Sequence, residues 1–417
     1  MTASSPRKPL KVVYFNYLWD LYEGSLGSTL KAQKLMRGLR RLGHSVEEFW
    51  LNAKSYSPGN QSKGLAEAKL SRLKRHFGRY FHEASQLLKN FRYAWQERNI
   101  IRTLRPDIVI SRHGGYVLST AVLAKIYRFP FVLEIDSPEA YENRKFYSDR
   151  YLQIPGLVEL VERLNFRLAP RGFVQSKVLF RYVIRRGSFL EKDLAVIPNA
   201  ADELDLREIR REAAALRQKL GLGSEIVVGF VGSFHYWHGV ENLMAIMSGV
   251  LGEKNGVPVH FLLIGGGGAK EKELKSFVRQ NGYEDRVAFT GFVNPEQVHI
   301  YLQAMDIALA PYPPMEFFYY SPVKMFDYMA HGKPIVASRL GQLAEILVHE
   351  RTALLCDPSR PDEFVNAILR LAGDKELRQR LGTNARAEYT ASHQWIDRAQ
   401  ALERFCKETV GECSGWK

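Results

Sequence analysis

Strand-like and helix-like segments alternate along almost the whole chain, and this alternation constrains the fold more than any other feature. Short apolar runs rich in β-branched residues, such as KVVYFNY (11–17), DIVISRH (107–113) and FVLEID (131–136), predict buried strands. The segments between them carry apolar residues at three- and four-residue steps, which predicts helices. Strands that alternate with helices form parallel sheets with helices on both faces. The sequence therefore predicts an α/β fold.

The alternation stops once and then restarts, which predicts two domains. Residues 200–224 are charged and contain no strand-like run, whereas EIVVGFVGS (225–233) begins a second series of strands and helices. We expect two doubly wound, Rossmann-like domains facing across a cleft, with ligands at the carboxyl ends of the strands. The predicted boundaries are 1–203 for the first domain, 204–390 for the second, and 391–417 for a helix that crosses back to the first.

The net charge of +14 is concentrated in one helical segment. Residues 63–105 hold eleven Lys and Arg against three Glu, and apolar residues from Leu70 to Trp95 recur at helical steps. Basic and aromatic residues on one helix are typical of a segment that lies on an anionic membrane surface. A core helix with a solvated basic side would show the same pattern, so both interpretations stay open. Nucleic acid is not an expected partner, because the sequence has no zinc-finger spacing and no aromatic RNA-binding signature.

The sequence also predicts a location. No run approaches the roughly 18 consecutive apolar residues that span a membrane, and the first ten residues lack the apolar core of a secretory signal. The three Cys, at 356, 406 and 413, have no paired spacing, which fits a reducing compartment and predicts no metal site. We expect a cytoplasmic protein, peripheral on the inner face of the membrane if the 63–105 segment binds lipid.

A loop after one predicted strand carries candidate phosphate-binding residues. In GFVGSFHYWHG (229–239), Gly232 lets a ligand approach the backbone, and the following helix presents its positive N-terminal end. Ser233 can donate to a phosphate oxygen, and His238 can pair with one when protonated. The alternative is an ordinary turn between a strand and a helix.

Two further glycine-rich loops follow strands. After VAFTGFV (287–293), backbone groups around Thr290 and Gly291 are placed to read the edge of a base, unless this is a plain connection. The run LLIGGGG (262–268) lacks the G-x-G-x-x-G spacing of a dinucleotide site. We therefore expect close backbone packing there and no NAD.

The stretch SPVKMFDYMAHGKPIVAS (321–338) carries the most chemistry. Ser321 is predicted to cap a helix that Gly332 ends. Spacing of i, i+3 and i+7 places Lys324, Asp327 and His331 on one helix face. A Lys in the first turn opposes the helix dipole, which is explained if an anion binds nearby. A Lys–Asp surface pair is the alternative.

This stretch, followed by GQLAEIL (341–347), resembles the nucleotide-sugar-binding signature of retaining glycosyltransferases of family 4, which have the GT-B fold. GFVGSFHYWHGVENL, FLLIGGG, RVAFTGFV and VIPNAAD resemble the family's other landmarks, in the family's order. The resemblance covers the second half of the chain and extends more weakly through the first. It implies transfer of a sugar from a nucleotide-diphosphate sugar with retention of configuration, and no metal or other cofactor.

The resemblance also implies roles for residues of the second domain. The donor contacts expected are Gly232, Ser233, His238, Thr290, Gly291, Ser321, Lys324 and Asp327. Asp327 takes the place of the family's Glu, which binds the ribose and is one methylene longer. The family's other acid, eight residues earlier, falls on Tyr319, and Glu316 is the nearby candidate to replace it in catalysis. His238 takes the place of a Lys.

Three residues of the first domain are candidate catalytic or acceptor contacts, because they end predicted strands: His113, Glu134 and Asp136. A structural role, bonded to a neighbouring loop, is the alternative for each. The first βα loop, with Gly24 and Gly27, is expected to close over the donor phosphates or the acceptor.

We expect a glycosyltransferase whose partners are a nucleotide sugar and a polysaccharide, glycolipid or other glycoconjugate acceptor, in polysaccharide or cell-envelope biosynthesis. Two alternatives stay open. One is a nucleotide-sugar epimerase of the same fold, and the other is a non-catalytic, membrane-associated subunit that binds nucleotide sugar.

Overall fold

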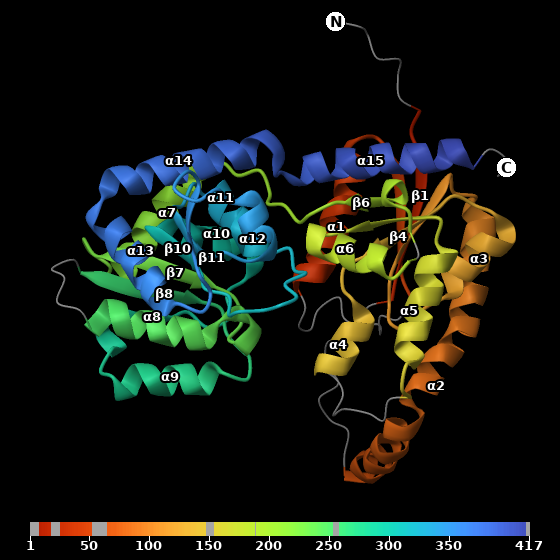
Figure 1. Cartoon of the computed structure of the whole chain (residues 1–417), viewed down its shortest axis with the longest axis horizontal. Coiled ribbons are helices and arrows are strands. Elements are labelled where there is room, and N and C mark those ends of the chain that lie inside the picture. The colour runs from red at the N-terminus through yellow and green to blue at the C-terminus, as the bar shows by residue number, and fades with distance from the viewer. Residues whose placement is uncertain are drawn as a thin grey trace, which may run out of the picture. The chain divides into compact units, whose positions relative to one another are not determined.

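A computed structural model describes residues 8–17, 26–51, 65–146, 154–187, 189–252 and 258–413, without the side chains of 26–28, 65–80 and 146 (Figure 1). The chain forms two compact units. Unit 1 comprises residues 1–198 and 398–417, and unit 2 comprises residues 199–397. The first unit therefore ends five residues before the predicted boundary, and its C-terminal part starts seven residues after the predicted one.

Unit 1 is built on a six-stranded parallel sheet in the order β2-β1-β3-β4-β5-β6. Its strands are β1 (Lys11–Asn16), β2 (Ser45–Trp50), β3 (Ile108–Arg112), β4 (Phe131–Ile135), β5 (Arg171–Val174) and β6 (Leu194–Val196). Its helices are α1 (Leu26–Arg41), α2 (Leu65–Leu104), α3 (Ser119–Tyr127), α4 (Glu139–Phe146), α5 (Leu157–Leu168) and α6 (Lys177–Arg185), with α15 (Trp395–Glu412) from Arg398 onward.

Unit 2 is built on a second six-stranded parallel sheet, in the order β12-β11-β10-β7-β8-β9. Its strands are β7 (Ile226–Val231), β8 (Val259–Ile264), β9 (Val287–Phe289), β10 (Ile307–Ala310), β11 (Ile335–Ser338) and β12 (Ala353–Cys356). Its helices are α7 (Leu206–Lys219), α8 (Val240–Gly252), α9 (Glu271–Gln280), α10 (Pro295–Ala304), α11 (Val323–Ala330), α12 (Gly341–Ile346), α13 (Pro361–Gly373) and α14 (Lys375–Ser392). The predicted α/β class with two doubly wound parallel sheets is confirmed.

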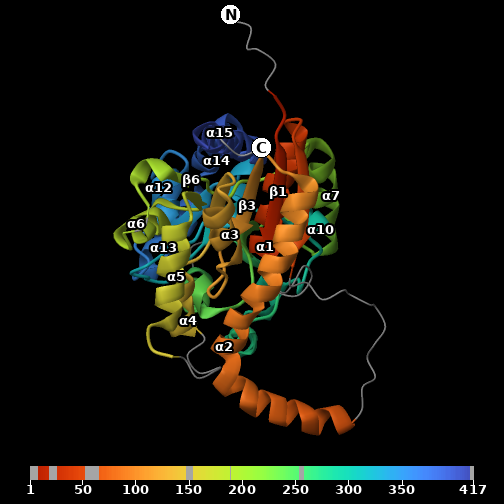
Figure 2. The ribbon, with the colours of Figure 1, turned by 90° about the vertical axis from the view of Figure 1, so that its right-hand side faces the viewer.

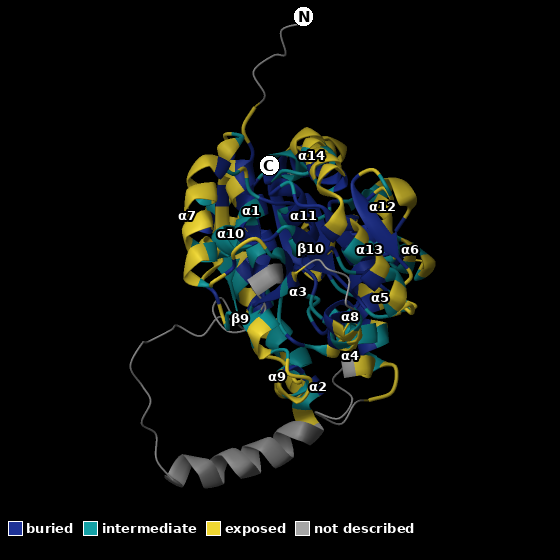
Figure 3. Ribbon diagram, turned by 90° about the vertical axis from the view of Figure 1, so that its left-hand side faces the viewer, coloured by how far each residue is buried: buried dark blue, intermediate teal, exposed yellow. Residues whose placement is uncertain are grey.

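Two apolar cores lie on opposite faces of the unit 2 sheet. Residues of α8, α9 and α13 pack on one face around Phe230 and Phe261, and residues of α10, α11 and α12 pack on the other around Met325 and Tyr328. Side chains that alternate along a strand point to opposite faces, so each strand supplies both cores. Figure 3 shows the strand β10 buried between helices whose outer sides are exposed.

The end of the chain completes unit 1. Arg171 of β5 lies with Nη2 3.2 Å from the Glu408 carboxylate of α15, and its guanidinium stacks 4.2 Å from the Phe405 ring. His44 lies 3.2 Å from Glu403 of the same helix. These contacts fix α15 to unit 1.

No helix in the described part of the chain is both long and apolar enough to cross a bilayer.

The loop after β7 depends on one glycine. Gly239 has a left-handed φ of 81°, and a Cβ there would lie 1.8 Å from the carbonyl oxygen of Pro311. Only glycine allows this approach, which holds the start of α8 against the strand end of β10.

We expect Gly239→Ala to lower the free energy of unfolding by at least about 2 kcal/mol. The alanine Cβ would clash with the Pro311 carbonyl oxygen, and its backbone would be strained at a left-handed φ. Urea denaturation followed by circular dichroism measures this. Gly252→Ala in α8 is the control, because a Cβ there meets nothing within 4 Å and should leave stability unchanged or higher. Equal effects of the two changes would contradict the role of Gly239.

Candidate functional site

A single buried ammonium group marks the strand ends of unit 2. Lys324 extends from the first turn of α11, with Nζ 4.4 Å from the centre of the Phe230 ring and 5.2 Å from that of Tyr312. Nζ lies 3.0 Å from where a Cβ would stand on Gly232, whose φ is 146°. The residue is partly exposed, but its Nζ atom is buried and has no hydrogen-bond partner in the structure.

This arrangement suits an anion. Burial lowers the pKa of Lys324 to about 7, because a charge without a partner is costly away from water. The two rings supply only a weak cation–π attraction. A phosphate group beside Gly232 would supply the missing partner, and the absence of a side chain there leaves the backbone open to it. The buried ammonium without a partner is therefore a physical reason to expect that Lys324 binds an anion.

His238 is neutral in this site. Its Nδ1 donates to the Ser233 carbonyl oxygen at 2.8 Å and lies 3.2 Å from the Ser233 hydroxyl. Burial, followed by the nearby Lys324 charge, lowers the pKa of His238 to about 3. Since Nδ1 carries the proton, Nε2 is an acceptor, which suits a ligand hydroxyl better than a phosphate oxygen. The condition for His238 to pair with a phosphate oxygen, a protonated ring, is therefore disfavoured by its surroundings.

The ends of β8 and β9 are tied together by backbone groups. The Gly265 amide donates to the Gly291 carbonyl at 3.1 Å, and the Thr290 hydroxyl bonds to the same carbonyl at 2.8 Å. A Cβ on Gly265 would lie 2.4 Å from the Gly232 carbonyl oxygen. The glycine run therefore allows close backbone packing, as the sequence predicted. Thr290 and Gly291 hold the loop in which base contacts are expected.

Ser321 does not cap α11, so that prediction is wrong. The residue before the helix is Pro322, and no side chain caps it. The Ser321 hydroxyl instead accepts from the Asn199 amide at 2.9 Å, and the Ser321 carbonyl accepts from the Asn199 side chain at 2.6 Å. Ser321 thus fixes the loop before α11 to the segment that begins unit 2, and leaves the first amides of α11 without a side-chain cap.

His331 does not belong with Lys324, contrary to the expectation from spacing. It follows the last turn of α11, is buried, and lies with Nε2 3.0 Å from His299 and Nδ1 3.1 Å from Gln303, both on α10. Burial lowers the pKa of His331. His331 therefore joins two helices of the core.

The three positions compared with the acids of the family signature, Asp327, Tyr319 and Glu316, differ in their exposure to solvent. Asp327 lies on α11 and is partly exposed; its carboxylate acts with burial and Asp202 to raise the pKa of Tyr389. Tyr319 is buried, with its ring 4.2 Å from that of Tyr320. Glu316 is exposed in the loop after β10, and its catalytic role stays a prediction.

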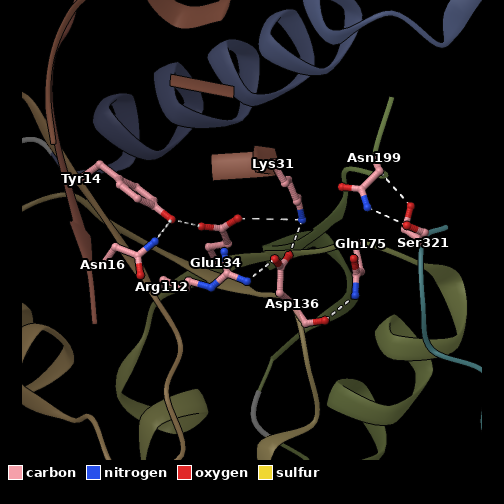
Figure 4. Close-up of polar contacts among 9 residues, drawn as sticks. All are labelled: Tyr14, Asn16, Lys31, Arg112, Glu134, Asp136, Gln175, Asn199 and Ser321. Carbon is pink, nitrogen blue, oxygen red and sulfur yellow. Dashed lines mark hydrogen bonds and ion pairs between the residues drawn. The ribbon is translucent and has the colours of Figure 1, made fainter. Parts of the chain in front are cut away.

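The carboxylates at the end of β4 lie in a buried charge network of unit 1 (Figure 4). Lys31 of α1 bonds to Asp136 and lies 3.8 Å from Glu134. Arg112 of β3 donates to Asp136 at 2.5 Å, and the Tyr14 hydroxyl donates to Glu134 at 2.5 Å. The network pairs two cations with two carboxylates.

The pairing sets the charge of each carboxylate. Burial raises the pKa of Asp136, but Arg112 and Lys31 outweigh it and hold that pKa below its usual value. Burial and the neighbouring Asp136 raise the pKa of Glu134. Asp136 is fully paired without a substrate, whereas Oε1 of Glu134 is buried without a hydrogen-bond partner, 3.8 Å from Lys31. The pairing favours the structural alternative for Asp136 and leaves both roles open for Glu134.

His113 also lies among buried polar groups. Its Nδ1 is 2.9 Å from the Asn165 side chain, and its Nε2 is 3.7 Å from the Glu162 carboxylate. Glu162 accepts from the Ala140 amide at 3.0 Å and from the Tyr182 hydroxyl at 2.7 Å. These bonds join β3 to α4, α5 and α6, so the structural alternative accounts for His113 as well.

The predicted first loop is only partly described. Gly24 lies outside the described residues, and Gly27 lies inside α1 rather than in the loop. No group of three or more His, Cys, Asp or Glu side chains that could hold a metal occurs among the described residues.

Sequence reasoning missed Lys31, Arg112 and Tyr14. One signal was available: Arg112 ends a strand that begins with three apolar residues, and a charge at the end of such a buried strand needs an opposite charge nearby. Nothing in the local sequence of α1 marks Lys31 as its neighbour.

We expect Lys31→Met to lower the free energy of unfolding by about 3–5 kcal/mol, because it leaves the two buried carboxylates with a single cation. Thermal and urea unfolding measure this. Arg37→Met on the exposed side of α1 is the control and should change stability by less than about 0.5 kcal/mol. A loss below about 1 kcal/mol for Lys31→Met would show that the network does not stabilise unit 1.

Comparisons with known proteins match both units. Residues 225–374 match the family described as "Glycosyl transferases group 1", and residues 27–200 match the "Glycosyl transferase 4-like domain". An uncharacterized glycosyltransferase of Methanocaldococcus jannaschii is 28% identical over 295 residues, which cover 70% of each chain.

Solved structures share the whole fold. Sucrose-phosphate synthase from Thermosynechococcus elongatus aligns with a TM-score of 0.69 at 20% identity, covering 97% of this chain and 100% of that one. The Anabaena protein HepE, in complex with UDP and glucose, aligns with a TM-score of 0.65 at 19% identity, covering 96% and 100%. At such identities the likeness shows the fold alone.

Proposed function

Since this chain belongs to the group 1 glycosyltransferases with the GT-B fold, we propose that it transfers a sugar from a nucleotide-diphosphate sugar to an acceptor hydroxyl with retention of configuration. The observation that carries this proposal is the buried, unpartnered Lys324 ammonium at the strand ends of unit 2. A donor diphosphate is an anion of the right charge for it. Retention is supported by the resemblance of residues 321–338 to the signature of retaining enzymes.

Sugar transfer requires that the departing nucleoside diphosphate be stabilised. The bond between the anomeric carbon and the diphosphate oxygen breaks, a bond to the acceptor oxygen forms, and the acceptor proton passes to the departing diphosphate. Lys324 would stabilise the developing charge on that diphosphate, with the open backbone at Gly232 beside it. Asp327 would hold the ribose hydroxyls, and the loop at Thr290 and Gly291 would meet the base.

The acceptor class is proposed from the same resemblance. It is a polysaccharide, glycolipid or other glycoconjugate, which places the reaction in polysaccharide or cell-envelope biosynthesis. The reaction needs no metal in this proposal, because a cationic side chain and backbone amides serve the diphosphate. The protein would act in the cytoplasm, where nucleotide sugars are made.

The direct test is a panel of UDP-, GDP- and ADP-sugars, with and without a lipid and glycan extract. UDP-glucose is the first donor to try, because the structural neighbour HepE was solved with it. Transfer to the extract would support the proposal. A rearranged sugar formed without acceptor would indicate an epimerase, and tight binding without turnover would indicate a non-catalytic subunit. No binding of any nucleotide sugar would refute the proposal.

The pH dependence of donor affinity should report on Lys324. Below pH 7 the ammonium is already protonated, so affinity should be flat; above pH 7, binding must take up a proton, and affinity should fall up to about tenfold per pH unit. Titration calorimetry in two buffers of different ionisation enthalpy measures this uptake. Lys324→Met should weaken binding roughly 10- to 100-fold and remove the slope. An unchanged slope in that variant would place the titrating group elsewhere.

Asp327 should contribute to donor affinity without holding the fold. We expect Asp327→Ala to weaken donor binding roughly tenfold, because a ribose would lose a charged hydrogen-bond acceptor. Asp327→Glu should bind at least as well as the original chain, since the family signature has Glu there. Equal donor affinity for all three proteins in the same calorimetric assay would remove Asp327 from the site.

A further inference from the structure

A row of large apolar side chains faces solvent on α2. Phe81, Leu88, Phe91 and Trp95 are between 62% and 77% exposed. Their spacing of seven, three and four residues places them on one side of the helix, opposite the buried Tyr93 and Glu97. Water-facing aromatic rings in such a row are unusual for a helix that packs on a sheet by its other side.

The neighbouring helices extend this surface. Helix α3 packs beside α2, where Arg98 donates to the Tyr127 hydroxyl at 3.0 Å, and α5 packs on the other side of α3 (Figure 2). Ile126 of α3 is 63% exposed and Leu160 of α5 is 54% exposed. Ten of the fourteen large apolar side chains exposed in the described part of the chain belong to α2, α3, α5 or the turn before α5, so the exposure is concentrated there. We call these three helices the three-helix face.

The exposed charges on the three-helix face are basic, and its one partly exposed acid among the described side chains, Glu159 of α5, is paired with Arg144 at 3.1 Å. Exposed bases occur on each helix, among them Arg102, Lys125 and Arg163. The two Glu of α2 whose side chains are described are buried: Glu83 accepts from the Tyr116 hydroxyl at 2.6 Å, and Glu97 accepts from Ser119 and Tyr17. These two acids of α2 are therefore turned inward to hold α2 on the unit, and the exposed bases are turned outward.

We propose that the three-helix face docks on the surface of a bilayer that contains anionic phospholipid. Aromatic and leucine side chains enter the boundary between headgroups and acyl chains, and flanking Lys and Arg meet the phosphates. Charge complementarity selects this partner, because a face of bases and aromatics, whose one partly exposed acid among the described side chains is paired with Arg144, matches lipid phosphates. The inference goes beyond sugar transfer and beyond the 63–105 segment, since it includes α3 and α5.

The test uses the full chain and vesicles of phosphatidylcholine with or without about 30% phosphatidylglycerol. We expect co-sedimentation with the anionic vesicles only, and release by about 1 M salt. Leu88→Ser, Phe91→Ser and Trp95→Ser together should reduce binding at least about tenfold. Arg102→Glu, Lys125→Glu and Arg163→Glu together should reduce it by a similar factor.

A matched control carries Arg207→Glu, Arg211→Glu and Lys272→Glu, which change the same net charge on exposed sites of unit 2. It should bind vesicles like the original chain. Equal losses for both charge variants, or no binding of the original chain to anionic vesicles, would overturn the proposal. If the original chain forms dimers and does not bind vesicles, and the serine variant is monomeric, the face pairs with a second copy of the chain instead of a bilayer. Thermal unfolding confirms that each variant folds, and donor affinity should be unchanged in all of them, which separates this proposal from the proposed function.

Discussion

Parallel pairing of the strands is the constraint on which every candidate residue depends. Because all strands of a sheet run the same way, their carboxyl ends meet at one edge, and the loops that follow them come together. In unit 2 this edge brings Gly232, Gly265 and Gly291 within backbone contact, and it places Lys324 beside them. In unit 1 the same edge gathers Arg112 and Asp136. The chemistry of each unit is a consequence of its topology.

The buried cations at the two sheet edges differ in whether a carboxylate is paired with them. In unit 1, the cations Lys31 and Arg112 are both paired with carboxylates of the same unit. In unit 2, Lys324 has aromatic rings around its ammonium and no counter-charge in the structure. A cation paired within its unit stabilises the fold, whereas an unpaired buried cation favours a ligand of opposite charge. This contrast, more than the presence of charged residues at strand ends, distinguishes the candidate donor site of unit 2 from the charge network of unit 1.

Much of the fold and part of the site could be predicted from the sequence. The period of apolar residues is a local property, so the strands, the helices and the α/β class could be predicted. Ser321 has the right residue type for a cap, but its hydroxyl accepts from Asn199, 122 positions earlier, which no local pattern reveals. His331 has the right spacing for the Lys324 face, but α11 ends before it, and its ring bonds to His299 of α10. Side-chain partners that are distant in sequence decided each of these positions.

The position of α15 has a consequence for biosynthesis. Unit 1 consists of the first 198 residues and the segment from Arg398 onward, whereas unit 2 is a continuous stretch between them. During translation the chain emerges from its N-terminus, so unit 2 has all of its residues before unit 1 does. The contacts of Arg171 and His44 with α15 form only after the ribosome has made the last helix. The unit that begins first is therefore the one completed last.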